Sequence, residues 1–87
     1  MVMTNWKFAK AIDENEEFRI NHLNIWNFPW HCLNKKVEVL GPYEGQVYYF
    51  KHYEITDGTQ KIEFVAGEFV NSKVGIYIKD DLCDQKI

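Results

Sequence analysis

The sequence predicts a mainly β domain, a β-rich α+β fold built on a small, strongly bent antiparallel sheet of about four to six strands. Two observations indicate this class. First, residues 36–78 contain apolar runs rich in β-branched and aromatic residues, the composition that favours strands. Second, these runs are separated by Gly41-Pro42, Asp57-Gly58 and Asn71-Ser72, and such residues are typical of turns between strands.

Length and composition indicate one globular domain. The chain has 87 residues, of which 46% are hydrophobic, 16% aromatic and 26% charged, values that disfavour wholesale disorder. We divide residues 1–87 into an aromatic-rich N-terminal cover at 1–33, an antiparallel β core at 34–79 and an acidic tail at 80–87. A chain of this size buries only about 60–65% of its unfolded surface, so its large aromatic side chains are important for building a core.

The first segment of the cover fits two structures. Trp6, Phe8 and Ile12 are spaced either for a short amphipathic helix, with Thr4 as its N-cap, or for a less regular strand over residues 5–12. The helix is slightly favoured. In either case this segment is expected to pack on the sheet.

The rest of the cover is predicted to be extended. Apolar and polar residues alternate over residues 18–23, which indicates one half-buried strand. Pro29 lacks an N–H and disposes Phe28 to an extended backbone. Residues 25–30 are therefore expected to form a strand edge or a packed loop.

In the core, the patterns predict strands at residues 36–40, 46–55, 61–69 and 74–79. Asp57-Gly58 is interpreted as a two-residue type I′ turn, which pairs Thr56 with Thr59, Glu54 with Lys61, Tyr53 with Ile62, His52 with Glu63 and Phe50 with Val65. Treated in the same way, Asn71-Ser72 pairs Val70 with Lys73, Phe69 with Val74 and Val65 with Ile78.

Together the two registers predict a sheet that is apolar on both faces. One face carries Val47, Tyr49, Tyr53, Ile62, Phe64 and Tyr77, and the other carries Tyr48, Phe50, Val65, Phe69, Val74, Ile76 and Ile78. Such a sheet must coil into a barrel, switch phase at a bulge or be covered on its second face. Gly67 and Gly75 are the expected positions of bends. Either the aromatic N-terminal third or a partner molecule would provide the cover.

A short motif points to a known fold. Residues 37–45, Val-Glu-Val-Leu-Gly-Pro-Tyr-Glu-Gly, resemble a KOW-type segment, in which a strand runs into a Gly-Pro-x-x-Gly loop of an SH3-like barrel. The resemblance implies an SH3-like barrel. Val47, Tyr48 and Tyr49 stand where the KOW pattern has a further glycine, and basic residues are few, so RNA binding is not implied.

Charge and segment composition limit the partners and the location. The net charge is −3 and the pI about 5.5, so no basic field attracts nucleic acid or anionic lipid. The sequence shows neither a signal peptide nor an apolar run of transmembrane length, which predicts a cytoplasmic protein without membrane contact. Arg19 is the only arginine among many Lys, Asn, Ile, Tyr and Phe residues, a bias that suggests a low-GC bacterium or its phage-infected host.

No catalytic, metal-binding or cofactor motif is found. His22, His31, Cys32, His52 and Cys83 match no zinc spacing and no activated Cys-His pair, and no glycine-rich phosphate loop is present. We therefore expect no enzyme activity, no metal and no cofactor. Cys32 and Cys83 are interpreted as two reduced thiols, with a single bridge between them as the alternative.

The aromatic residues are the candidate binding residues, and they allow two interpretations: an internal lid on the second face, or an exposed contact patch. The candidates are Trp26, Trp30, Tyr43, Tyr48, Phe50 and His52. The favoured hypothesis is a non-enzymatic module for protein–protein contact, either with an unknown partner or as a homo-oligomer, for example a phage or mobile-element protein that inhibits a host factor.

Two other functions are alternatives to protein–protein contact. The first is capture of a nucleotide or another small molecule, with Lys51, Lys61 or Lys73 neutralising phosphate. The second is SH3/KOW-like binding of single-stranded nucleic acid, which the negative charge disfavours.

Overall fold

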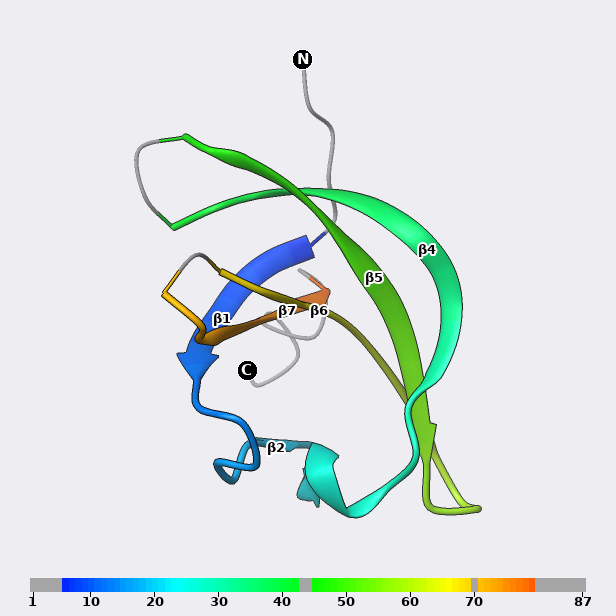
Figure 1. Cartoon of the computed structure of the whole chain (residues 1–87). Coiled ribbons are helices and arrows are strands. Elements are labelled where there is room, and N and C mark those ends of the chain that lie inside the picture. Colours follow the sequence, from blue (N-terminus) through cyan, green and yellow to red (C-terminus); the bar gives the residue numbers. More distant parts are fainter. Residues whose placement is uncertain (1–5, 43–44, 70, 80–87) are drawn as a thin grey trace, which may run out of the picture.

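A computed structural model describes residues 6–42, 45–69 and 71–79, and this part of the chain is nearly all β, as predicted (Figure 1). The main sheet is antiparallel, with the strand order β1-β7-β6-β5-β4, and β2 and β3 form a separate hairpin. The elements are β1 (Trp6–Ile12), β2 (Arg19–Ile20), β3 (Leu23–Asn24), the 3₁₀ turn η1 (Ile25–Asn27), β4 (His31–Leu40), β5 (Val47–Thr56), β6 (Lys61–Glu68) and β7 (Val74–Lys79).

The segment at residues 6–12 is the strand β1, so the preference for a short helix was wrong. It pairs along the edge of β7, from Trp6 opposite Lys79 to Ile12 opposite Val74, with a bulge between Phe8 and Lys10. A helix this short is unstable by itself because nucleation outweighs its few hydrogen bonds. Pairing with β7 satisfies the same backbone groups, so tertiary contact determines the structure.

The single strand predicted at residues 18–23 is a hairpin instead. The chain reverses at Asn21 and His22, whose φ angles of 50° and 72° are both positive, as a type I′ turn requires. Asn tolerates this left-handed backbone better than most residues. Phe28 is extended, with φ −134° and ψ 149°, as expected before Pro29, and residues 25–30 form a packed loop with one 3₁₀ turn.

The β5–β6 hairpin has a four-residue loop, so the predicted register was wrong by two residues. Thr56 pairs with Lys61 and Tyr53 with Phe64; likewise Glu54 lies opposite Glu63 and His52 opposite Val65. The side chain of Asp57 accepts hydrogen bonds from the backbone N–H groups of Thr59 and Gln60, at 2.8 and 3.0 Å, and thereby keeps two more residues in the loop. A shift of two leaves every side chain of this hairpin on its predicted face.

The β6–β7 hairpin differs by one residue, which does exchange the faces of β7. Val65 pairs with Tyr77, where Ile78 was predicted. The N–H of Phe69 donates to the carbonyl of Lys73 at 2.8 Å, and Ser72 has φ 71°, so the turn resembles a three-residue loop with a left-handed residue. Tyr77 therefore shares a face with Phe50 and Val65, whereas Val74, Ile76 and Ile78 lie on the opposite face.

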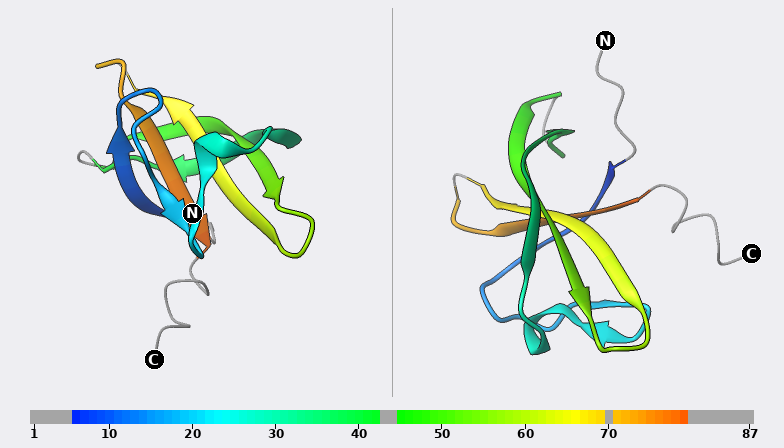
Figure 2. Two further views of the ribbon diagram at one scale, coloured as in Figure 1. Left: turned by 90° about the horizontal axis from the view of Figure 1, so that it is seen from below. Right: turned by 90° about the vertical axis from the view of Figure 1, so that its right-hand side faces the viewer.

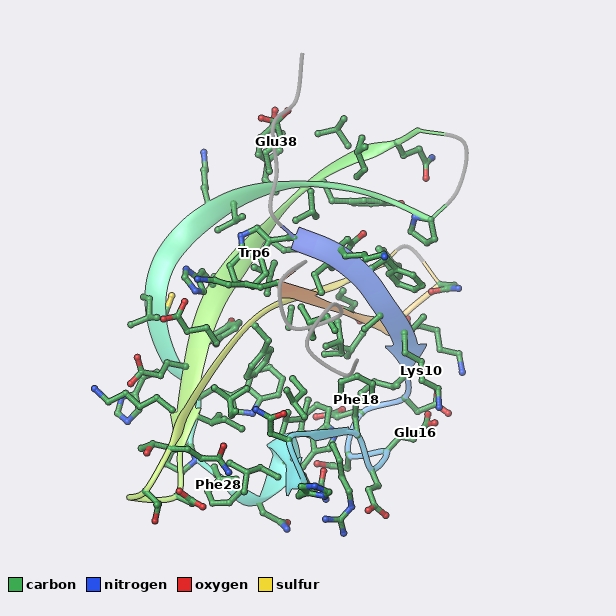
Figure 3. All side chains as sticks on the ribbon, turned by 180° about the vertical axis from the view of Figure 1, so that it is seen from behind. Trp6, Lys10, Glu16, Phe18, Phe28 and Glu38 are labelled. Atoms are coloured by element: carbon green, nitrogen blue, oxygen red, sulfur yellow. The ribbon has the colours of Figure 1, made fainter. Side chains whose placement is uncertain are left out.

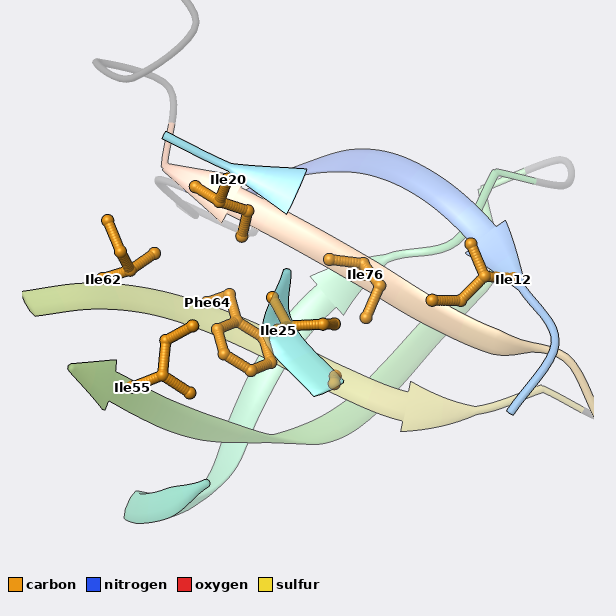
Figure 4. Packing of buried hydrophobic residues seen from close by; sticks show 8 residues of the cluster. Ile12, Ile20, Ile25, Ile55, Ile62, Phe64 and Ile76 are labelled. Atoms are coloured by element: carbon orange, nitrogen blue, oxygen red, sulfur yellow. The ribbon is translucent and has the colours of Figure 1, made fainter. Parts of the chain in front are cut away.

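The sheet is apolar on both faces and strongly bent, as predicted (Figure 2). One buried cluster lies between the sheet and the β2–η1 segment (Figure 4) and contains Ile12, Ile20, Ile25, Ile55, Ile62, Phe64, Ala66 and Ile76. The second is formed by Val39, Phe50, Val65, Phe69 and Tyr77, with Trp6 and Phe8 of β1 packed against it. Both faces are thus covered by the chain's own elements over much of their area.

Gly67 and Gly75 lie opposite each other in the sheet. A Cβ atom on Gly67 would lie 2.1 Å from the ring of Phe50, and one on Gly75 would lie 2.4 Å from the ring of Phe69. Both glycines therefore leave the space that aromatic rings of the second cluster occupy.

Candidate functional site

The residues predicted to form a binding patch are divided between the two faces of the sheet. Trp26 and Trp30 pack against the cluster under the β2–η1 segment, whereas Tyr48 and Phe50 belong to the second cluster. Tyr43 lies outside the described residues. The six candidates therefore do not form one continuous patch.

The tryptophan-rich segment covers the face opposite to Tyr48 and Phe50. The indole N–H of Trp26 donates to the carbonyl of Glu16 at 2.6 Å, and that of Trp30 donates to the carbonyl of Ile25 at 2.9 Å. Both rings are half-buried. The indole N–H groups therefore bond within the protein, and only the exposed parts of the rings are free to contact a ligand.

Tyr48 and Phe50 are core residues. Their rings stack with centroids 5.2 Å apart, and Phe50 is only 7% exposed. The Tyr48 hydroxyl donates to the side chain of Gln46 at 2.9 Å. The same cluster holds Tyr77, whose hydroxyl donates to the carbonyl of Leu40 at 2.8 Å; burial, with a smaller contribution from Tyr48, raises the pKa of Tyr77 to about 12.

His52 belongs to a polar cluster beside this core. Its Nε2 lies 3.1 Å from Oε1 of Glu63, the same oxygen that Nζ of Lys79 approaches to 3.3 Å. The Trp6 ring packs edge-on against His52 at 4.9 Å. Burial alone would raise the pKa of Glu63, but its hydrogen bonds and charge interactions with Lys79 and His52 outweigh that effect and lower it. The expected contact between His52 and Glu63 is thus present, although it is diagonal and not directly cross-strand.

One part of the sheet is not covered. Side chains along β5 alternate between the two faces of the sheet. Those of Val47, Tyr49 and Lys51 are exposed, and they lie on the same face as Tyr53 and Ile55, which come later in the strand. On β4, Leu40 pairs with Val47 and Glu38 with Tyr49. We call the surface of Glu38, Leu40, Val47, Tyr49 and Lys51 the open face.

The open face is apolar at its centre. Tyr49 is 64% exposed, Leu40 44% and Val47 40%. Residues 18–30, which cover this face of the sheet elsewhere, are called the covering segment. This segment lies at the opposite end of the molecule from the open face: in Figure 3, Phe18 and Phe28 are far from Glu38. The sequence correctly predicts Val47 and Tyr49 on one face with Tyr53. The predicted binding residues Tyr48 and Phe50 lie on the other face, and Leu40, Tyr49 and Tyr53 were not among the candidates.

An aromatic pocket lies where the covering segment ends, on the same face of the sheet. Its volume is about 310 Å³, and it is lined by Glu14, Trp26, Trp30, Tyr53, Ala66, Gly67, Glu68, Ser72 and Val74. The ring centroid of Trp30 lies 5.0 Å from that of Trp26 and 5.1 Å from that of Tyr53. The three rings therefore form one continuous aromatic wall.

The charge around the pocket is negative. Among the described residues that line it, the charged ones are the acidic Glu14 and Glu68. The nearby Lys73 points its Nζ to Asp13, 2.7 Å away, and this hydrogen bond and charge interaction raise the pKa of Lys73. The pocket thus presents aromatic rings and carboxylates, and Lys73, whose chain neighbours Ser72 and Val74 line it, is already paired.

Hydrogen bonds fix the loop that carries Glu14. The backbone N–H of Asp13 donates to the Glu16 carboxylate at 2.8 Å; this hydrogen bond is the main reason that the pKa of Glu16 is lowered. With the bond from Trp26 to the Glu16 carbonyl and the ion pair between Asp13 and Lys73, the loop is attached to both walls of the pocket.

Other kinds of site are not found in the part of the chain that the structure describes. Within residues 6–42, 45–69 and 71–79, no group of three or more His, Cys, Asp or Glu side chains could hold a metal ion. Nor do these residues include a helix with the length and hydropathy needed to span a membrane. Cys32 is a free, exposed thiol, and Cys83 lies outside the described residues.

Comparison of the chain with models of known protein families, with curated proteins and with solved structures gave no match. The resemblance of residues 37–45 to a KOW-type segment of an SH3-like barrel therefore remains a prediction.

Proposed function

We propose that this protein is a small non-enzymatic binding module that acts through protein–protein contact at its open face. The observation that carries the proposal is the grouping of Leu40, Val47 and Tyr49, all large, apolar and at least 40% exposed, on neighbouring positions of two paired strands. Exposed apolar groups that adjoin one another are characteristic of interfaces. Tyrosine is also among the residues that most often dominate binding energy.

The charge distribution supports a protein partner over a nucleotide or nucleic acid. The open face contains one carboxylate and one ammonium group, and both charged side chains among the described residues of the adjoining pocket are carboxylates. Phosphate would be repelled by the carboxylates of Glu14 and Glu68 in that pocket, and Lys73 is engaged with Asp13. With a net charge of −3, a phosphate-driven interaction receives no support from the rest of the protein either.

Site-specific photo-crosslinking in host cells tests the proposal. A benzophenone amino acid would replace Tyr49 on the open face and, as the matched control, Thr59 in the β5–β6 loop, which is also exposed but lies beyond the opposite end of β5. We expect a discrete crosslinked protein from position 49 and none from position 59. Equal capture from both positions, or none from position 49, would contradict the proposal.

The same experiment distinguishes a different protein from a second copy of this chain. A crosslinked product of twice the chain's mass from position 49 would make the module a homo-oligomer that associates through the open face. A product containing another protein would assign the face to a heterologous partner, of which a factor of a bacterial host is the example that the composition suggests.

A further inference from the structure

We propose that the aromatic pocket binds an arginine side chain of the protein partner, an inference that rests on the proposed function of the open face. The pocket supplies the groups that recognise a guanidinium ion: aromatic rings and carboxylates. Neither feature alone identifies the ligand, but together they favour a flat organic cation.

The shape of the aromatic wall favours arginine over a more compact cation. The ring of Trp30 packs against those of Trp26 and Tyr53, with centroid separations of 5.0 and 5.1 Å, so neither pair of rings is far enough apart to enclose a rounded ammonium group. They present a continuous surface instead. A guanidinium group is planar, stacks on aromatic faces and is less strongly hydrated than an ammonium group.

The carboxylates complete the site. The ion pairs of the described residues use other acidic residues, Asp13, Glu16, Glu17 and Glu63, so Glu14 and Glu68 have no ion-pair partner within residues 6–42, 45–69 and 71–79. Their charge favours a cation at the aromatic wall and opposes an anion. The fork of N–H groups on a guanidinium ion matches the oxygens of a carboxylate.

Size and position connect the pocket with a peptide on the open face. A volume of about 310 Å³ is at the lower end of the range of ligand pockets, roughly 300–1,000 Å³, and suits one long side chain. Tyr49 and Tyr53 are on the same face of β5. They are four residues apart, which is about 13 Å at a rise of about 3.3 Å per residue. A segment bound along the open face can therefore extend one arginine into the pocket.

The first test is a titration of the isolated protein with Nα-acetyl-arginine methylamide, followed by the indole N–H signals in two-dimensional NMR spectra. The signals of Trp26 and Trp30 are expected to shift in a saturable manner, while that of Trp6, on the other face, stays in place. The citrulline analogue has the same shape without the charge and should cause no shift. Equal shifts with citrulline, or no shift with arginine, would overturn the proposal.

Matched variants test the carboxylates without touching the core. We expect Glu68→Gln and Glu14→Gln each to weaken arginine binding by about two- to fivefold, and Glu54→Gln, which removes the same charge from the opposite face of the sheet, to leave it unchanged. An equal loss in all three variants would indicate a general charge effect and would refute the site. Binding of the lysine analogue as tightly as the arginine analogue would overturn the assignment to arginine.

The two proposals fail separately. If a partner is crosslinked at position 49 but the arginine probe does not bind, the open face stands and the pocket assignment falls. If the probe binds but no protein is crosslinked, the pocket is a site for a free guanidinium compound, and the claim of a partner's side chain is wrong.

Discussion

Replacing Gly67 with alanine should destabilise the protein severely, because the space for a Cβ atom is occupied by the ring of Phe50. The new atom would lie 2.1 Å from Cδ1 and 2.3 Å from Cγ. The first distance falls about 1.3 Å short of ordinary contact, which begins at 3.4 Å. Because Cγ is the ring atom nearest the backbone, rotation of the ring cannot relieve the clash.

The ring of Phe50 has little space to move into. Its centroid lies 5.2 Å from that of Tyr48, 5.5 Å from that of Phe69 and 6.0 Å from that of Tyr77. Overpacking of this kind costs about 1–3 kcal/mol, and we expect about 3 kcal/mol at this position. A domain of this size has a free energy of unfolding of about 5–10 kcal/mol, so the midpoint of thermal unfolding should fall by about 10–20 °C.

A double-mutant cycle identifies the cause. Phe50→Ala removes Cγ and Cδ1 and alone should cost about 3–5 kcal/mol, but in its presence Gly67→Ala should cost little, which gives a coupling of about 2 kcal/mol. Chemical unfolding followed by circular dichroism would measure all four proteins. The control is Gly58→Ala with Phe50→Ala, since no atom lies within 4 Å of a Cβ at Gly58. If Gly67→Ala and Phe50→Ala were additive, the packing described for the second cluster would be incorrect.

Three further changes test other parts of the structure. Gly58→Ala, at φ 93°, should lower the free energy of unfolding by about 1–2 kcal/mol through backbone strain alone, and a change below 0.3 kcal/mol in denaturant melts would refute that backbone angle. Tyr77→Phe removes the hydrogen bond to the carbonyl of Leu40 and should cost about 1 kcal/mol, measured in the same way; an unchanged melt would mean that this bond does not form. Folding lowers the pKa of Glu63 from 4.5, so the contribution of this carboxylate to stability is complete above pH 4.5 and is lost as the pH falls below that value. Glu63→Gln should therefore make the unfolding midpoint less sensitive to acid between pH 6 and 3.5. Parallel pH profiles of the two proteins would contradict the role of Lys79.

The strands of the core could be predicted from the sequence because alternation and turn residues are local signals. The observed β7 is Val74–Lys79, the range predicted at 74–79; β5 differs from its predicted range by one residue at each end and β6 by one residue at its C-terminal end. The predicted start of the first core strand at residue 36 was wrong, because β4 begins at His31 through pairing with β5. The lengths of the loops between these strands were harder to predict from the sequence. The side chain of Asp57 and the left-handed Ser72 each add residues to a turn, and the resulting shift at Ser72 exchanged the faces of Tyr77 and Ile76.

The N-terminal third could not be predicted because its structure depends on distant partners. Residues 6–12 become a strand only through the edge of β7. Asn21 and His22 adopt the two-residue type I′ turn that the sequence analysis expected at Asp57-Gly58. The sequence also placed Val47, Tyr49 and Tyr53 on one face, but it could not show that the covering segment reaches Tyr53 and stops before Tyr49.

Binding of the crosslinked partner to two charge variants would test the central claim most directly. Tyr49→Glu places a carboxylate on the open face, and Thr59→Glu places the same group in the exposed β5–β6 loop, so the change in net charge is matched. With both variants folded as judged by their melts, we predict that Tyr49→Glu weakens the partner's affinity at least a hundredfold, about 2.7 kcal/mol, and that Thr59→Glu leaves it unchanged. Equal affinity of both variants would show that the partner binds elsewhere on the protein.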